Sequence, residues 1–330
     1  MALYLANFAM FFRMISIMGN NKALRAHISL LSAEIFWGLL APVGKAAMLH
    51  GVDNMSLVSF RVIGAAILFW LSSLFVKERM PWRHVLMMSG AALLAIVLNQ
   101  CVYTVGLSLT SPVNSSIVTT SMPIFAMVLS FFILREPITW MKVVGVVIGC
   151  VGAVVLIMSS AQSGGKSGNI LGDLMCMGAQ FAFALYLTLY NPIIKQYNVV
   201  TVNKWMFTWS CVFILPFTSG HVLGQSWSSV SFSAWMETLY VVVFGTFMSY
   251  LLVVVGQRVL RPTVVSVYNY VQPVVSVVVS VLTGLSVFTL PQGIAVIFIF
   301  SGVWLVIKSK SKRDMKGKSV EIEQGDERKV

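Results

Sequence analysis

The sequence predicts an all-α integral membrane protein of ten transmembrane helices, built as two inverted five-helix repeats. The first supporting observation is composition: 58% of the 330 residues are hydrophobic, only 10% are charged, and the mean hydropathy is +0.86. Soluble domains carry about 25% charged residues because their surface must stay hydrated. The second observation is the length of the apolar blocks, and the third is an internal repeat.

The apolar blocks are about 18 to 22 residues long, which is the length that an α-helix needs to cross about 30 Å of hydrocarbon. Charged or turn-forming residues separate one block from the next. In the first half, the blocks predict helices near residues 28–48, 57–76, 85–104, 113–134 and 142–160. In the second half, they predict helices near residues 170–190, 201–218, 236–256, 263–284 and 291–308.

The internal repeat has an offset of 150 residues and needs no gaps. The best evidence is the shared residues that dictate helix geometry: Pro112 with Pro262, Pro123 with Pro273, Gly106 with Gly256, and Gly152 with Gly302. Because each half holds five spans, the second half must start from the opposite side of the membrane. The predicted organisation is a cytoplasmic N-terminal segment with a candidate start-site extension (1–27), a first repeat (28–160), a linker (161–169), a second repeat (170–308) and a charged cytoplasmic tail (309–330).

Positive charge is concentrated in loops that alternate along the chain. Of the 23 Lys and Arg residues, 20 fall in one set of alternate loops and termini, although the whole chain carries a net charge of +12. Cytoplasmic loops are enriched in Lys and Arg, so both termini are expected in the cytoplasm of a cell of bacterial type, with the chain in its cell membrane. Acidic lipid headgroups account for such juxtamembrane charge, which argues against a nucleic-acid partner.

Several short motifs occur in a fixed order. Trp37-Gly38 is followed by Lys45, Arg61 lies early in the second predicted helix, and the stretch from Pro123 to Glu136-Pro-Ile-Thr precedes Gly145 and Gly152. In this order the motifs resemble EamA-type permeases of the drug/metabolite transporter superfamily, and residues 28–308 fit two EamA domains. The resemblance implies transport of metabolites such as amino acids without ATP hydrolysis. One departure is Ser286, where the family usually repeats the glutamate found at Glu136.

Glu34 is the most informative candidate for a binding residue. It lies about 9 Å into the first predicted helix, where a carboxylate facing lipid is costly. One interpretation is a proton site or a site for a substrate amine. The other is an acid at headgroup level, paired with a loop Lys or Arg.

The other candidate substrate-binding residues also have two interpretations. Lys45 and Arg61 either give an outer vestibule a positive field or extend to the headgroups. Tyr268 and Gln272 share a helix face at i, i+4 and either line a cavity or pack against a helix. The remaining candidates are polar or aromatic residues within predicted helices, where amides and hydroxyls link helices or contact a solute: Trp37, Asn99, Tyr103, Asn114, Gln180, Tyr186 and Tyr250.

The pattern as a whole predicts a secondary transporter that moves a small polar metabolite or amino acid by alternating access, with export as the favoured direction. Inverted repeats typically hold their substrate near mid-membrane, where the halves meet. Protons are the candidate coupling ion, and the chain is expected to be a monomer or homodimer in the lipid bilayer. The alternatives are a flippase for lipid-linked or amphiphilic molecules and, more remotely, an intramembrane enzyme or sensor. No phosphate loop, HExxH or GxSxG motif, or cysteine pair indicates an enzyme, a cofactor or a metal.

Overall fold

The computed structural model describes residues 21–109, 118–160, 170–282 and 290–309, and all regular elements in these ranges are helices. The first half contains α2 (Lys22–Leu49), α3 (Asn54–Ser73), α4 (Trp82–Ala92), the π-helix η1 (Leu93–Val102), α5 (Tyr103–Leu109), α7 (Met122–Leu134) and α8 (Trp140–Ser160). The second half contains α9 (Ile170–Leu189), α10 (Asn191–Ile194), α11 (Val199–Gly224), the 3₁₀-helix η2 (Trp227–Ser229), α12 (Phe232–Val242), the π-helix η3 (Val243–Met248), α13 (Ser249–Val259), α14 (Pro262–Val267), the 3₁₀-helix η4 (Tyr268–Tyr270), α15 (Val271–Leu282) and α16 (Leu290–Lys308).

Short polar side chains start several of these helices. The carboxylate of Asp53 accepts hydrogen bonds from the first backbone amides of α3, and Asn21, Asn198 and Ser231 do the same for α2, α11 and α12. Such caps satisfy N–H groups that have no partner within the helix. At the C-terminal end of α7, Arg135 adopts a left-handed conformation (φ 53°, ψ 40°), and Pro137 follows two residues later. The sequence therefore ends the apolar helices at defined points.

Within the described residues, six helical stretches are long and apolar enough to cross a membrane: Lys22–Leu40, Asn54–Ser73, Trp82–Val102, Ile170–Leu189, Val199–Gly224 and Phe232–Val259. Three shorter apolar helices accompany them, namely Met122–Leu134, Trp140–Val155 and Gly293–Lys308. The described residues therefore have the helical structure predicted, and it is consistent with a membrane protein. Ten spans in two inverted repeats remain a prediction. The observed helices differ from the predicted ranges mainly at their ends: α2 begins earlier, at Lys22, and α11 continues to Gly224.

Three helices of the first half begin at positions that correspond to helix starts in the second half. α4 begins at Trp82 and α12 at Phe232, η1 at Leu93 and η3 at Val243, and α8 at Trp140 and α16 at Leu290. Each of these pairs is 150 residues apart, which is the offset of the sequence repeat. The two π-helical segments are an unexpected part of this correspondence. Such segments are rare and often occur at functional sites.

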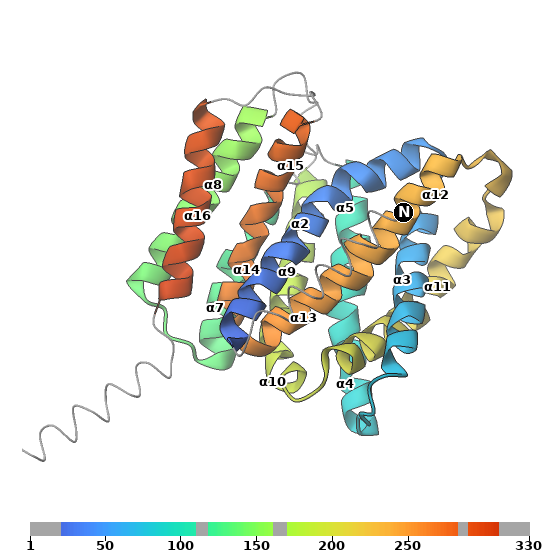
Figure 1. Ribbon diagram of the computed structural model, residues 1–330, viewed down its shortest axis with the longest axis horizontal. Coiled ribbons are helices and arrows are strands. Elements are labelled where there is room, and N and C mark those ends of the chain that lie inside the picture. The colour runs from blue at the N-terminus through green and yellow to red at the C-terminus, as the bar shows by residue number, and fades with distance from the viewer. Residues whose placement is uncertain (1–20, 110–117, 161–169, 283–289, 310–330) are drawn as a thin grey trace, which may run out of the picture.

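Figure 1 shows α8 and α16 side by side at one end of the molecule, and α3 and α11 at the other end. The middle of the molecule interleaves the halves: α2 packs against α13, α12 and α15 of the second half, and α9 packs against α5, η1 and α7 of the first. Glycines allow the close approach, since a Cβ atom at Gly256 would lie 2.5 Å from the Leu30 side chain. Large apolar side chains such as Phe132 and Phe217 face outward, as expected for contact with lipid.

Candidate site between two interrupted helices

The candidate site begins at an interruption in the helix from Pro262 to Leu282. The 3₁₀-helix η4 (Tyr268–Tyr270) separates α14 from α15, and Pro273 lies in the first turn after it. The first half has a turn at the corresponding place, at residues 120–121, just before α7 and Pro123. Proline removes a backbone hydrogen bond within a helix, which favours such an interruption. Interrupted helices at matching positions of two halves indicate a binding site in transporters of repeat architecture.

The two interruptions contact each other. The Asn269 side-chain amide of η4 donates a hydrogen bond of 3.5 Å to the backbone carbonyl of Thr119, a residue 150 positions earlier. Asn269 also accepts a hydrogen bond from the Gln272 amide. Neither residue is charged, so the junction of the halves is polar but neutral at this point.

Glu34 of α2 joins the same network. Its Oε2 accepts a hydrogen bond of 2.7 Å from Gln272 Nε2 of α15, and only 3% of the residue is exposed. Gly38, one turn further along α2, makes this contact possible. A Cβ atom at Gly38 would lie 2.8 Å from Val275 Cβ and 3.1 Å from the carbonyl oxygen of Gln272. Within the described residues, Glu34 forms no ion pair, and its partner is an amide of the other half and not a loop Lys or Arg.

Tyr268 and Gln272 both face α2, as their i, i+4 spacing predicts. The Tyr268 hydroxyl lies 2.8 Å from Nδ1 of His27, a residue seven positions before Glu34 on α2. The sequence pattern gave no reason to single out His27 or Asn269. His27 is recognisable only once α2 is known to begin at Lys22 and thus to include it in the helix.

A second group of polar side chains surrounds Tyr250 of α13. Its hydroxyl accepts a hydrogen bond of 3.1 Å from Gln100 Nε2 of η1 and donates one of 3.0 Å to the carbonyl of Ala95. Gln100 and Tyr250 are again 150 residues apart. The ring of Tyr250 packs edge-on against Trp37 and Phe207, with centroid distances of 5.7 and 5.1 Å. This second group therefore also links the two halves.

Trp37 and Arg61 both bond to η3 of the second half. Trp37 Nε1 donates to the Gly245 carbonyl at 3.1 Å, and Arg61 Nε donates to the Thr246 hydroxyl at 3.0 Å. Arg61 therefore extends toward the second half rather than toward a headgroup. Lys45 belongs to α2, but its side chain lies outside the described residues, as does the whole of Asn114.

The other predicted site residues lie along α9 or contact it. Asn99 Nδ2 donates to the Ala179 carbonyl at 3.0 Å, and the Tyr103 carbonyl accepts from the Cys176 thiol. Gln180 is buried on α9 at 8% exposure. Tyr186 is bonded to Gln257 Oε1 at 3.1 Å, a contact within the second half. The predicted residues that the structure describes thus form two groups, each of which links the two halves, and a row along α9. Two described surface hollows, on α16 and between α3 and α11, include none of them.

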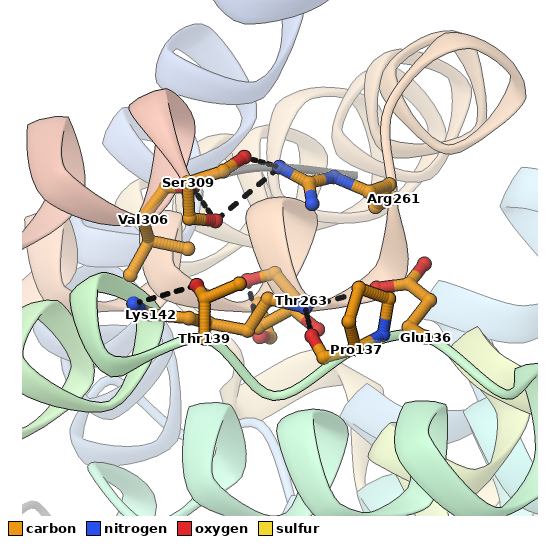
Figure 2. A network of polar contacts seen from close by, with 9 residues as sticks. Glu136, Pro137, Thr139, Lys142, Arg261, Thr263, Val306 and Ser309 are labelled. Atoms are coloured by element: carbon orange, nitrogen blue, oxygen red, sulfur yellow. Dashed lines mark hydrogen bonds and ion pairs between the residues drawn. The ribbon is translucent and has the colours of Figure 1, made fainter. Parts of the chain in front are cut away.

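A buried ion pair lies outside these groups, at the loop between α7 and α8. Lys142 Nζ is 3.3 Å from Glu136 Oε2 and donates to the Pro137 carbonyl at 3.0 Å, while only 1% of its side chain is exposed. Figure 2 shows this loop beside Arg261, which donates to the Ser309 carbonyl at 2.8 Å at the end of α16. Glu136 thus has a cationic partner within its own half, six residues away.

Long apolar helices, with buried polar contacts between the two halves, define a polytopic membrane protein. The sequence profile of the EamA-like transporter family matches residues 24–158 and 170–308, so the chain belongs to this family. Similar proteins include the uncharacterized transporter YetK of Bacillus subtilis, 20% identical over 89% of this chain and 90% of the relative. Another is a WAT1-related protein of Arabidopsis thaliana, 21% identical over 87% and 85% of the two chains.

A solved crystal structure has the same fold. It superposes with a TM-score of 0.70 and 18% sequence identity, covering 85% of this chain and 95% of the other. Together with the family match, the relatives indicate a multi-pass membrane protein that transports a solute.

Proposed function

We propose that the chain is a secondary transporter that carries a small polar metabolite or an amino acid by alternating access, with export as its working direction. The observation that carries the proposal is the pair of hydrogen bonds Asn269–Thr119 and Gln100–Tyr250, which join the two halves in the interior. Each joins residues 150 positions apart. Contacts between equivalent residues are expected on the axis that relates two repeats, where inverted-repeat transporters bind substrate.

The packing of α8 against α16 supports two symmetry-related repeats. A Cβ atom at Gly145 would lie 2.9 Å from the Gly302 carbonyl oxygen, and one at Gly152 would lie 2.9 Å from the Ala295 carbonyl oxygen. Positions 145 and 295 correspond under the 150-residue offset, and so do 152 and 302. The contact of position 145 with 302 is therefore repeated by their equivalents, positions 295 and 152. Such a pair of contacts is expected where a two-fold axis relates the two repeats. Such an axis within one membrane chain supports ten spans as inverted repeats of residues 28–160 and 170–308.

Alternating access requires contacts that can be exchanged between the halves. One such contact is that of α2 with α15, which includes the Glu34–Gln272 hydrogen bond. Its equivalent under the repeat is the contact of α9 with α7. Separating one of these helix pairs while keeping the other would open the interior to one side. The positive loops orient the chain with both termini in the cytoplasm, which places Glu34 in the cytoplasmic half of the path. A proton on Glu34 is the proposed coupling ion.

Transport in reconstituted liposomes tests the proposal. Purified protein would be screened for counterflow of radiolabelled amino acids, nucleosides, sugars and amphiphiles, with empty liposomes as the control. We expect one small polar class to exchange, and Tyr250→Phe to slow that exchange because it removes the hydroxyl that joins Gln100 to Ala95. Gly178→Ala is the matched control, since no atom lies within 4 Å of the added methyl group. Exchange of amphiphiles alone would instead support a flippase.

A pH series in the same liposomes tests the coupling ion. If Glu34 carries a proton during transport, Glu34→Gln should remove the dependence of flux on an imposed pH gradient. A pH-dependent flux that is unchanged in this variant would rule out the proton role and leave facilitated diffusion as the mechanism.

A further inference from the structure

The contact between Glu34 and Gln272 has an internal comparison within the same chain. Under the 150-residue offset, Glu34 corresponds to Ala184 of α9, and Gln272 corresponds to Met122 of α7. Both of these residues are buried, with exposures of 0% and 4%, and their helices α9 and α7 pack against each other. The equivalent positions therefore carry buried apolar side chains in the α9–α7 pair and an acid and an amide in the α2–α15 pair. Packing alone does not require the polar pair.

By this comparison, burying the polar pair lowers the stability of the fold and does not improve the packing of the helices. A carboxylate removed from water loses hydration that one amide hydrogen bond only partly replaces. Within the described residues, Glu34 has no Lys, Arg or His partner, and its one hydrogen bond comes from Gln272 at 2.7 Å. Intramembrane acids of this kind indicate a functional site whose partner has to be identified. Because a carboxylate is negatively charged, the partner that Glu34 lacks would be a cation.

The surrounding groups fit an ammonium ion. The Gln272 amide donates to both Glu34 and Asn269, so each of these two oxygens can accept from another donor in its place. An ammonium group has three N–H donors and no acceptor, which matches a carboxylate and two amide oxygens. A carboxylate or phosphate placed against Glu34 would instead be repelled, so the carboxylate of a bound amino acid has to lie away from Glu34. The nearest aromatic residue on the same face of α2 is Trp37, three positions along.

We propose that Glu34, together with Gln272 and Asn269, binds the ammonium group of the transported solute, so that the substrate is a primary amine or an amino acid. This proposal rests on the proposed transport function and assigns the part of the solute that the site recognises. Gln272 and Asn269 occupy the interrupted helix of the second half, while Glu34 comes from the first half. Binding of the amine thus replaces a hydrogen bond between the halves with contacts to the solute, which couples recognition to their separation.

Matched pairs of ligands test the charge requirement. Purified protein in nanodiscs would be titrated with the amino acids that have uncharged side chains, with the diamine putrescine, and with the form of each compound that is acetylated at every amine and therefore has no ammonium group. Ligands that bind the native state raise the melting temperature, and the increase grows with the ratio of ligand concentration to Kd. We expect at least one free amine to stabilise the protein while its N-acetyl form does not. We expect Glu34→Gln to weaken binding of that amine at least tenfold.

The apolar counterpart in the chain supplies the folding control. A Glu34→Ala, Gln272→Met double variant reproduces the Ala184 and Met122 arrangement and is expected to melt no lower than the wild type, yet to lose amine binding. Retained affinity in Glu34→Gln would overturn the proposal, as would equal binding of free and acetylated compounds. If no amine binds while a sugar or nucleoside exchanges in liposomes, amine recognition fails and transport stands. If no solute of any class exchanges, both proposals fail.

Discussion

Lys142 and Glu136 form a charge pair that is almost completely enclosed at the α7–α8 loop, with side-chain exposures of 1% and 11%. The pair has no counterpart in the second half, where the corresponding residues are Gln292 and Ser286. Both members are replaced together, as expected if neither is tolerated alone in a buried position. The sequence prediction noted only the missing glutamate, because Lys142 lies six residues away and its role depends on the turn between α7 and α8.

Removing one member of this pair should therefore cost more than removing both. We predict that Lys142→Met destabilises the protein by about 3 to 5 kcal/mol, because Glu136 would remain buried without a partner. The Glu136→Gln, Lys142→Met double variant should recover most of this loss. Thermal unfolding in detergent measures both effects. His221→Ala is the control: its pair with Asp53 is exposed (53% and 43%), so its loss should cost less than about 1 kcal/mol.

Gly38 offers a second prediction for a single residue. An added methyl group would lie 2.8 Å from Val275 Cβ and 3.1 Å from the Gln272 carbonyl, so α2 and α15 would have to separate. We predict that Gly38→Ala weakens solute binding at least fivefold by disturbing the Glu34–Gln272 contact. Gly44→Ala on the same helix is the matched control, since its nearest neighbour would be 3.9 Å away, in ordinary contact. Equal affinity of the two variants would contradict the role given to Gly38.

At the scale of elements, α8 and α16 pack backbone against backbone at one end of the molecule (Figure 1). A Cβ atom at Gly302 would lie 2.6 Å from both the Gly145 carbonyl oxygen and the Gly149 amide nitrogen. Backbone atoms cannot move aside as a flexible side chain can. Small residues are the usual means of bringing transmembrane helices together, because lipid supplies no hydrophobic driving force between them. The contact therefore depends on glycine at this position.

We predict that Gly302→Ala forces α8 and α16 apart and lowers the melting temperature by several degrees. In a helix without such a contact, the same change should be neutral or stabilising by up to about 1 kcal/mol, because alanine favours the helical conformation. Gly178→Ala of α9 provides that comparison, since the added methyl group meets no atom within 4 Å. Thermal unfolding of the two variants side by side decides whether the α8–α16 contact contributes as proposed.

The sequence was sufficient to predict the helices and the family, but only part of the candidate site. Apolar blocks identified most of the helices, because helix formation in a membrane depends on local composition, while ten spans in two inverted repeats remain a prediction. Gln272 and Glu34 were recognised as polar residues within helices, but their mutual contact was not, since it joins residues 238 positions apart. The π-helices η1 and η3 were missed, because no residue type marks a π-turn as proline marks an interruption. His27 was missed because the predicted first helix began at residue 28, whereas α2 begins at Lys22.

At the scale of the whole molecule, the inverted repeat makes a prediction about topology that is independent of the solute. The loop between α3 and α4 and the loop between α11 and α12 correspond under the 150-residue offset, so inverted halves must place them on opposite sides of the membrane. We predict that a cysteine at Lys77 is protected from a membrane-impermeant maleimide in intact cells, whereas a cysteine at Ser228 is labelled. Both residues are exposed in the described structure, so neither result would reflect burial.

The labelling would use a background in which the four native cysteines, all on helices in the described structure, are replaced. Permeabilised cells provide the control, in which both positions should react equally. Labelling of both positions in intact cells would place the loops on one side and exclude inversion, even if the two halves share one fold. Labelling of Lys77→Cys alone would keep the inversion but reverse the orientation, and Glu34 would then lie in the outer half of the path.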